Sequence, residues 1–432
     1  MSPKQRRQAK PAGAKPPSAK ASSSSPKRRS ASAIADLDNI LHRGVIEIVP
    51  EDEFVEALRS GRKLRLKLGL DPSKPDLHIG HGVLLRKLQQ LQELGHQVVL
   101  IVGDYTAQIG DPSGQSVMRP MLSADEVRAN AETYMRQFFH VVDKKKTEVR
   151  WQSEWFSKFT LEDVVRLAGR FTVAQMLQRE DFRQRFDAQK PLGIHELLYP
   201  LLQAYDSIAI DADVEFGGSD QLFNMLVGRE LQQQMGHRAQ AVFTMRLLVG
   251  TDGSQKMSKS LGNTIDLEDP PGEQFGKVMS LPDAALADYL ELATDLPDEE
   301  LAYLRTQVKA GGAKAMAVKK RVAHEIVAMF HGEQAAQEAE AEFERVFQQG
   351  QRPEDAARDV RVDGATLSLV DLLVREGVAA SKGEARRLVR QGAVELDGRK
   401  VAADEAGSLR VESGALLRVG KHHFLRVVSK TS

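Results

Sequence analysis

Residues 62–82 read RKLRLKLGLDPSKPDLHIGHG, and this stretch decides the fold of the chain. Every second residue from 64 to 70 is Leu, an alternation that predicts a β-strand with one face in the core. The same alternation places Lys67, Gly69 and Asp71 on the opposite face. We therefore expect a short strand whose polar face points into a site.

A helix is expected directly after this strand. Pro72 and Pro75 end the strand, and the apolar spacing from about residue 83 to 94 is that of an amphipathic helix. His78 and His81 stand at its N-terminus, where backbone N–H groups and the helix dipole favour anions. An isolated His-x-x-His is more often an ordinary helix start, but here the two imidazoles can add donors to a triphosphate.

A second basic motif makes a nucleotide site the better interpretation. Residues 256–260 read KMSKS and follow a Gly- and Ser-bearing segment, which predicts a mobile loop that carries Lys256 and Lys259. Alone, this loop would be a solvated basic segment. His-Ile-Gly-His followed about 175 residues later by Lys-Met-Ser-Lys-Ser resembles the two signatures of class I aminoacyl-tRNA synthetases.

Composition limits the class of protein. The chain has 432 residues, 41% of them hydrophobic, which is enough for two to four domains and a sizeable core. It contains no run of eighteen apolar residues and no apolar secretory core, so we expect no membrane partner. The chain has no cysteine, which excludes disulfides, cysteine nucleophiles and thiolate metal sites. We expect a cytoplasmic enzyme that holds no metal of its own.

The first 35 residues differ from the rest in charge. They carry nine Lys or Arg and no acid, whereas the remaining residues hold 51 basic and 60 acidic groups. The segment is rich in Ser, Pro, Ala and Lys, which predicts a disordered basic tail. An organellar transit peptide would also be basic and Ser-rich, but the prolines oppose its amphipathic helix. We favour a retained tail that is solvated or weakly attracted to RNA phosphates.

The strand and helix described above begin an alternating α/β pattern. Residues 98–104 form a continuous apolar run that ends in Asp104, as expected for a buried strand of a parallel sheet. Ligands bind beyond the carboxyl ends of such strands, where Asp71 and Asp104 lie. The turn at 109–114 presents Asp111 at the same edge.

The second half of the sheet is expected after a helical insertion. Residues 120–200 are mostly helical by pattern, and 208–216 read as the next strand. Gly217 and Gly218 follow that strand and open another helix, so a ribose or base can approach the backbone there. Residues 36–60 look helical and are expected to pack on this domain.

We therefore predict an α/β fold in which a Rossmann-like parallel-sheet catalytic domain is followed by an α-helical domain and a small α+β RNA-binding module. The last segment carries twelve Lys or Arg against eight acids, which suits RNA phosphates, although a solvated helix is the simpler alternative. The predicted boundaries are 1–35 for the tail, 36–270 for the catalytic domain with its 120–200 insertion, 271–350 for the helical domain, 351–366 for a linker and 367–432 for the module.

The linked order of six motifs resembles bacterial-type tyrosyl-tRNA synthetase over roughly residues 40–430. The C-terminal segment is similar to the RNA-binding module, named after a small-subunit ribosomal protein, that this family carries. The motifs are Gly69-Leu70-Asp71-Pro72-Ser73, His78-Ile79-Gly80-His81, Ile109-Gly110-Asp111-Pro112-Ser113-Gly114, Tyr199-x-x-x-Gln203-x-x-Asp206, Gly217-Gly218-Ser219-Asp220-Gln221 and Lys256-Met257-Ser258-Lys259-Ser260.

The resemblance implies a role for each matched residue. In the amino-acid pocket, the ammonium group would meet Asp111, Tyr199 and Gln203, the phenol hydroxyl would meet Asp206, and Gln221 would complete the lining. The ATP site would consist of Gly69, Asp71, Ser73, His78, Gly80, His81, Gly218 and Asp220, with Lys256 and Lys259 closing over the phosphates. Catalysis would rest on Ser73, His78, His81, Lys256 and Lys259, and RNA would bind Lys382, Arg386, Arg387 and Arg390.

The spacing of the pocket residues agrees with these roles. Tyr199, Gln203 and Asp206 are four and three residues apart, so they share one face of a helix. A half-buried helix face would show the same spacing, and Asp220 could be only an N-cap. One position departs from the family, in which a tyrosine commonly stands where this chain has Lys67. Lys67 is expected to pair with Asp206 or Asp104, or to donate to the substrate phenol.

The resemblance implies a two-step reaction. Tyrosine and ATP would give tyrosyl-adenylate and pyrophosphate, and the tyrosyl group would pass to the 3′ end of tRNA, with Mg²⁺ accompanying ATP. Catalysis would need positioning and charge stabilisation rather than a general base. A homodimer is expected through the insertion, which offers the apolar side chains Phe138, Phe139, Leu161, Val164, Val165 and Leu167. The alternatives are a tryptophanyl-tRNA synthetase and a non-catalytic RNA-binding protein built on a synthetase body.

Overall fold

The computed structural model describes residues 37–73, 76–113, 122–259, 261–345, 357–362, 366–379, 381–420 and 423–429. The predicted tail, residues 1–35, lies outside the described residues, as do residues 351–356 of the predicted linker. Residues 37–42 are helical, as expected.

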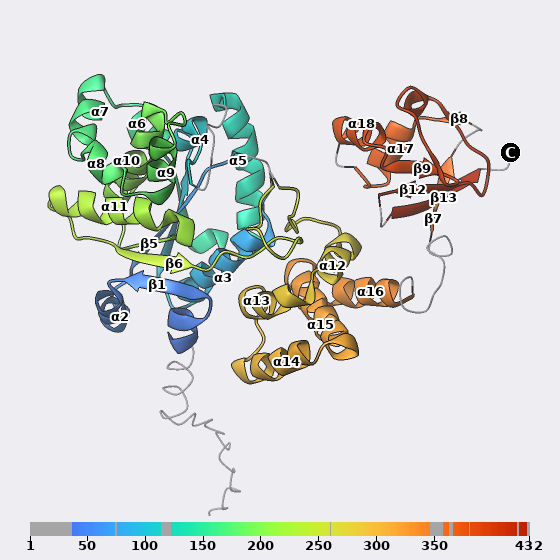
Figure 1. The fold of residues 1–432 in the computed structure, drawn as a ribbon, viewed down its shortest axis with the longest axis horizontal. Coiled ribbons are helices and arrows are strands. Elements are labelled where there is room, and N and C mark those ends of the chain that lie inside the picture. Colours follow the sequence, from blue (N-terminus) through green and yellow to red (C-terminus); the bar gives the residue numbers. More distant parts are fainter. Residues whose placement is uncertain are drawn as a thin grey trace, which may run out of the picture. The chain divides into compact units, whose positions relative to one another are not determined.

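A six-stranded sheet forms the centre of the catalytic domain (Figure 1), in the order β1-β6-β5-β2-β3-β4. The neighbours from β6 to β4 pair in parallel, and β1 pairs antiparallel to β6 at one edge. This confirms the Rossmann-like α/β prediction. The strands are β1 (Val45–Val49), β2 (Arg65–Leu70), β3 (Gln97–Val102), β4 (Thr147–Trp151), β5 (Val214–Gly218) and β6 (Ala241–Met245).

The chain order of the strands reverses between β2 and β5. The chain runs from β2 outward to β3 and β4, and then returns to add β5 and β6 on the other side of β2. A crevice forms beyond the carboxyl ends of the strands at such a point, because the connections leave in opposite directions. The polar segments that follow Leu70 and Gly218 therefore meet there.

Strand β2 is buried more fully than the sequence predicts. Leu66, Lys67 and Leu68 are all buried, so β2 buries both faces rather than one. A central strand of a parallel sheet is covered on both sides, and the Leu alternation concealed this because the intervening residues are charged. Lys67 is thus a buried charge, which needs a buried partner.

Two element assignments were wrong. Residues 45–49, predicted to be helical, form the edge strand β1, where pairing with β6 overrides local propensity. The strand predicted from Ile208 begins only at Val214, because Ile208 and Ala209 end the helix before it. The insertion also contains β4, a strand paired with β3.

Helices cover the sheet and fill the insertion. The helices α10, which begins at the end of the insertion, and α11, which follows β5, lie side by side (Figure 1), joined by a cluster that includes Leu201, Ala204, Val227 and Leu231. The helices are α2 (Glu51–Arg59), α3 (Ile79–Glu93), α4 (Thr106–Ile109), α5 (Ala124–Phe138), α6 (Ser153–Phe156), α7 (Leu161–Ala168), α8 (Val173–Met176), α9 (Glu180–Asp187), α10 (Ile194–Ala209) and α11 (Leu222–Gln234).

The segment after residue 270 is helical, as its periodicity predicts. Its core contains buried Ala315, Val318, Val322 and Ile326 from one face of the longest helix. The helices are α12 (Pro271–Met279), α13 (Leu286–Leu292), α14 (Asp298–Ala310), α15 (Gly312–His331) and α16 (Glu333–Phe343).

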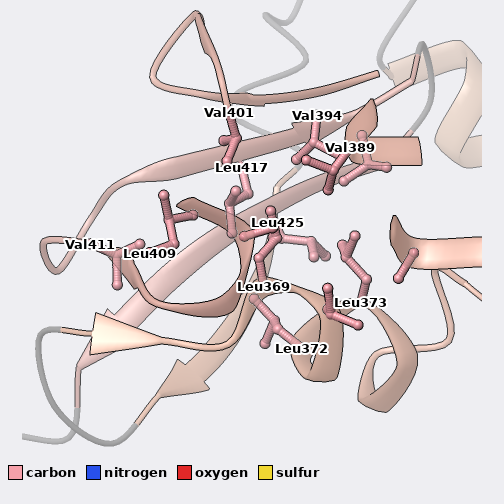
Figure 2. Packing of buried hydrophobic residues seen from close by; sticks show 14 of the residues in the cluster. Leu369, Leu372, Leu373, Val389, Val394, Val401, Leu409, Val411, Leu417 and Leu425 are labelled. Atoms are coloured by element: carbon pink, nitrogen blue, oxygen red, sulfur yellow. The ribbon is translucent and has the colours of Figure 1, made fainter. Parts of the chain in front are cut away.

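The C-terminal module packs two helices on a five-stranded sheet. Figure 2 shows the core, in which Leu369 and Leu373 of α17 and Val389 of α18 lie beside Leu417 and Leu425 of the sheet. The linker prediction is wrong for residues 358–362, which form β7 and pair in parallel with β13. The elements are β7 (Arg358–Val362), β8 (Thr366–Leu367), α17 (Leu369–Arg375), α18 (Lys382–Arg390), β9 (Val394–Leu396), β10 (Arg399–Lys400), β11 (Leu409–Arg410), β12 (Leu416–Val419) and β13 (His423–Ser429).

Candidate active site

A cavity of about 310 Å³ lies at the carboxyl ends of β2 and β5. All but two of the residues predicted for the tyrosine and ATP sites line it, the exceptions being Lys67 and Lys259. The structure therefore brings together side chains from motifs spread over nearly 190 residues of sequence. The predicted residues in the lining are Gly69, Asp71, Ser73, His78, Gly80, His81, Asp111, Tyr199, Gln203, Asp206, Gly218, Asp220, Gln221 and Lys256.

The rings of His78 and His81 lie against each other at the start of α3, with centroids 4.0 Å apart and planes tilted by 41°. The backbone N–H of His78 donates to Nδ1 of His81 at 3.3 Å, which leaves the proton of a neutral His81 on Nε2. A Cβ at Gly80 would lie 2.9 Å from Nδ1 of His78, so a larger residue there would move the imidazole. Nδ1 of His78 is itself buried and without a hydrogen-bond partner among the described residues.

Both imidazoles are neutral at pH 7. Burial lowers the pKa of His81 to about 4. Burial, together with the neighbouring His81, also holds the pKa of His78 well below its ordinary value. Two neutral imidazoles carry no positive charge but still offer N–H donors, the role that the sequence predicts for them at a triphosphate.

The two signature lysines lie in ion pairs. Nζ of Lys256 is 3.1 Å from Oδ2 of Asp220, and Nζ of Lys259 is 3.2 Å from Oδ2 of Asp76. Lys259 also pairs with Asp266 at 2.5 Å. Lys256 thus lies in the cavity beside one predicted ATP residue, whereas Lys259 is held outside the lining.

The segment after the lysine motif is hydrogen-bonded to the histidine motif. The backbone N–H of Ile79 donates to the carbonyl oxygen of Ile265 at 2.9 Å, and that of Leu267 donates to the carbonyl of Leu77 at 3.0 Å. Asn263 fixes the loop itself, because its Oδ1 accepts from the backbone N–H of Ser258 at 2.8 Å. The two signatures therefore share one local framework.

Asp206 lies at the buried end of the cavity and accepts two side-chain hydrogen bonds. Nε2 of Gln152 donates to Oδ2 at 2.8 Å, and Nε1 of Trp155 donates to Oδ1 at 3.2 Å. Burial raises the pKa of Asp206 to about 7, against the opposing effects of Lys67, Gln152 and Trp155. Each carboxylate oxygen keeps a lone pair for a ligand donor.

A series of hydrogen bonds runs from Asp206 through Gln152 and Thr106 to Asp71 in the lining of the cavity. The hydroxyl of Tyr199 donates to Oδ2 of Asp71 at 2.8 Å, and Oγ1 of Thr106 lies 2.7 Å from Oδ1 of the same carboxylate. Oε1 of Gln152 accepts from the backbone N–H of Thr106 at 2.9 Å, which orients its amide toward Asp206. Burial, followed by the charge of Asp71, raises the pKa of Tyr199 well above its ordinary value.

The remaining pocket residues form an amide cluster. Nε2 of Gln221 donates to Oδ2 of Asp111 at 2.9 Å and to Oγ of Ser113 at 3.0 Å. Nδ2 of Asn224 donates to Oε1 of both Gln203 and Gln221, at 3.0 and 3.1 Å. The cluster offers acceptor oxygens to a cationic group, as expected for an ammonium pocket.

Lys67 does not pair with Asp206 or Asp104, contrary to prediction. It stands opposite Glu215 in the β2–β5 register, and Nζ lies 2.9 Å from Oε1 of Glu215. Nζ also donates to the carbonyl oxygen of Gln203 at 2.7 Å and to Oγ of Ser207 at 2.8 Å. The neighbouring buried strand therefore supplies the opposite charge.

The four residues predicted to bind RNA lie on α18. Lys382, Arg386, Arg387 and Arg390 are all exposed, and Ala385 and Val389 bury the other face of the helix in the core of the module. Lys382 pairs with Asp371 at 2.7 Å, and Arg387 pairs with Glu384 at 3.3 Å. The helix presents positive charge outward, although two of the four cations have acidic neighbours.

Sequence reasoning missed several polar side chains of the site. Glu215 gave a usable signal, because a carboxylate inside an apolar strand implies a buried cation. The others carry no such signal, because their contacts arise only when the insertion folds back on the sheet. They are Thr106, Gln152, Trp155, Arg179 and Asn224.

The described residues contain neither a membrane-spanning helix nor a cluster of metal-binding side chains. None of the described helices is long and apolar enough to cross a membrane. Within the same ranges, no three His, Cys, Asp or Glu side chains gather in a way that could hold a metal ion.

Two family descriptions together match most of the chain. The family described as tRNA synthetases class I (W and Y) matches residues 59–348, and the Tyrosine--tRNA ligase SYY-like C-terminal domain matches residues 350–425. The Tyrosine--tRNA ligase of Dehalococcoides mccartyi strain CBDB1 is 55% identical over 392 residues, which are 91% of this chain and 98% of the relative. That of Thermotoga maritima is 48% identical over 388 residues, 90% of this chain and 96% of the relative.

Solved structures match the fold at low sequence identity. A C-terminally truncated mitochondrial tyrosyl-tRNA synthetase of Aspergillus nidulans matches with a TM-score of 0.61 and 20% identity, over 72% of this chain and 94% of that chain. The tyrosyl-tRNA synthetase of Archaeoglobus fulgidus, solved with L-tyrosine, matches with a TM-score of 0.57 and 22% identity, over 71% and 99% of the two chains. At these identities the likeness concerns the fold alone.

Proposed function

Because this chain belongs to the tyrosine–tRNA ligase family of class I synthetases, we propose that the cavity at the β2–β5 crevice is its catalytic site, with a tyrosine end and an ATP end. The chain is an ATP-dependent tyrosine–tRNA ligase. The assignment of the cavity depends on one observation: Asp206 is a buried carboxylate, and each of its two oxygens is held by one donor and can accept another.

The reaction has two steps, and in each step one bond forms as another breaks. The carboxylate oxygen of tyrosine attacks the α-phosphorus of ATP, and the bond to the bridging oxygen breaks to release pyrophosphate. A ribose hydroxyl at the 3′ end of tRNA then attacks the carbonyl carbon of the adenylate, and AMP leaves. The nucleophile of the first step is already ionised at neutral pH, so positioning and stabilisation of the phosphate charge are what the protein must supply.

At the tyrosine end, Asp206 accepts the phenol O–H. The ammonium group meets the acceptor oxygens of Asp111, Gln203 and Gln221, while Tyr199 stays bonded to Asp71 and shapes the wall. A site that hydrogen-bonds a hydroxyl rejects phenylalanine, because its own polar groups would be left unpaired. Lys67 acts behind this surface and does not reach the substrate.

At the ATP end, neutral His78 and His81 donate N–H groups to the phosphates at the start of α3. Gly69, Gly80 and Gly218 line the cavity without side chains, so the nucleotide can approach the backbone there. Lys256 leaves Asp220, and Lys259 leaves Asp76 and Asp266, to meet pyrophosphate as it departs. Ser73 supplies a hydroxyl in the same lining.

Mg²⁺ enters with ATP, held by the phosphates. The described residues offer no group of three His, Cys, Asp or Glu side chains suited to a metal ion.

A homodimer through the insertion is also proposed. Leu161 and Val165 on α7 are 79% and 62% exposed, one helical turn apart, and the insertion contributes further exposed apolar side chains in Val173, Phe186 and Ile194. Leu161 and Val165 form an exposed apolar pair on one face of α7, and such a pair indicates an interface. Phe138 and Leu167 do not belong to it, because both are buried in the subunit.

The remaining assignments concern the other domains and the location. We propose that the helical domain, residues 271–350, contacts the anticodon side of tRNA and that α18 binds tRNA phosphates through its exposed cations. We also propose a cytoplasmic location.

ATP–pyrophosphate exchange with each amino acid supplied separately tests the proposal. Exchange should require tyrosine, and tryptophan should not replace it. Exchange with tryptophan alone would favour the tryptophanyl alternative, and no exchange with any amino acid would favour a non-catalytic RNA-binding protein.

A further inference from the structure

A chain of hydrogen-bonded amides joins the buried Lys67–Glu215 pair to the tyrosine end of the cavity. Nε2 of Gln203 donates to Oε1 of Glu215 at 3.0 Å. Oε1 of Gln203 accepts from Nδ2 of Asn224, which also donates to Oε1 of Gln221. The carboxylate on β5 is thus connected to the two amides that line the pocket.

Charged groups at both ends of this series of hydrogen bonds fix the orientation of the amides between them. The carboxylate of Glu215 can only accept, so the group of Gln203 that faces it must be the NH₂. At the other end, the guanidinium of Arg179 can only donate, and its NH1 lies 3.0 Å from Oδ1 of Asn224. Each amide between these ends can therefore satisfy its neighbours in one orientation only.

Glu215 is itself held in place. Its Oε1 receives Lys67 and Gln203, and its Oε2 receives Ser207 at 3.3 Å and Gln240 at 2.5 Å. Lys67 and Glu215 are 0% and 1% exposed. The three protons of the Lys67 ammonium are all used by protein acceptors, so this cation has none left for a ligand.

We infer that Glu215 is a positioning residue for tyrosine, which turns the amide of Gln203 so that its carbonyl oxygen serves the substrate ammonium group. The inference rests on the proposed ammonium site. Without Glu215, the Gln203 amide can turn over and present its NH₂, a donor that repels an ammonium group. The effect is specific for one substrate group, which distinguishes it from general loss of structure.

The test compares the affinity of tyrosine with that of its des-amino analogue, 3-(4-hydroxyphenyl)propanoate. We expect Glu215→Met, which leaves no acceptor opposite Gln203, to raise the KM for tyrosine about 10-fold, equivalent to about 1.4 kcal/mol, with kcat changed less than about 2-fold. The inhibition constant of the analogue, which lacks the ammonium group, should stay within about 2-fold of the wild type.

Two further variants protect the test from failure to fold. Because Glu215→Met leaves Lys67 buried without its counter-ion, the double variant Lys67→Met/Glu215→Met removes both charges together and should show the same selective loss. Ser207→Ala is the matched control, since Ser207 contacts both members of the pair but not the Gln203 side chain. It should leave the tyrosine-to-analogue ratio unchanged.

The outcomes separate the inference from the proposed function. A selective loss of tyrosine affinity in both Glu215 variants supports the inference. Equal weakening of tyrosine and the analogue, or no weakening of either, overturns it. If the wild-type protein binds the analogue as tightly as tyrosine, the ammonium site itself is wrongly placed, and the inference falls with it.

Discussion

Replacing Asp206 by Asn should remove most of a pH dependence from the stability of the protein. The carboxyl is buried, and its pKa is raised from 3.8 to about 7, with burial as the largest cause. Asn has a similar size but does not titrate. It also offers one oxygen where Asp206 accepts from both Gln152 and Trp155, so one of those donors loses its partner at every pH.

The magnitude follows from the two pKa values. Because the folded pKa lies above the unfolded one, the stability that this proton contributes is fully present below about pH 3.8 and is lost as pH rises through about 7. The whole loss is about 4 kcal/mol, and about 2–3 kcal/mol of it falls between pH 5 and 8. The lost hydrogen bond costs the variant about 1–3 kcal/mol independently of pH.

Urea unfolding at pH 5, 6.5 and 8, at one protein concentration, measures the effect. The unfolding free energy of D206N minus that of the wild type should rise by about 2–3 kcal/mol from pH 5 to pH 8. Asp125→Asn, at an exposed position of α5, is the matched control and should follow the wild type. A D206N difference that stays constant within about 1 kcal/mol across this range would refute the assignment of a strongly raised pKa.

Three further predictions concern the lysine motif, the C-terminal module and the dimer. In single-turnover kinetics, Lys256→Ala should slow adenylate formation about 10²-fold with little change in tyrosine affinity, because the Lys256 ammonium meets charge that develops on pyrophosphate. The control Lys309→Ala, at an exposed site of α14, should change neither the rate nor the affinity. A chain that ends at residue 345 should retain pyrophosphate exchange but lose at least about 10-fold in tRNA charging, and loss of exchange as well would make the module structural. Leu161→Asp/Val165→Asp should convert a dimer to monomer in sedimentation at micromolar concentration, and a wild-type monomer under the same conditions would contradict the proposed interface.

The sequence predicted the arrangement of the cavity well, because its motifs lie at the ends of strands. His78 and Asp111 are far apart in the chain, yet both follow strands of a parallel sheet, whose carboxyl ends converge at one edge, and the structure places both in one lining. The helical spacing of Tyr199, Gln203 and Asp206 was equally sufficient, since α10 carries all three.

The errors have a common physical origin in tertiary context. Val45–Val49 becomes a strand only because β6 offers an unpaired edge, which no local pattern reports. Lys67 was assigned to carboxylates near it in the expected site, but the register of β2 with β5 places Glu215 beside it instead.

Discrimination between tyrosine and phenylalanine decides whether Asp206 recognises the phenol hydroxyl. Specificity constants for ATP–pyrophosphate exchange should be measured for both amino acids with the wild-type protein and with Asp206→Ala. The account predicts that the wild type prefers tyrosine by orders of magnitude and that Asp206→Ala loses most of this preference, because the hydroxyl acceptor is gone. An unchanged ratio in Asp206→Ala would contradict the account, since the hydroxyl would then be recognised elsewhere.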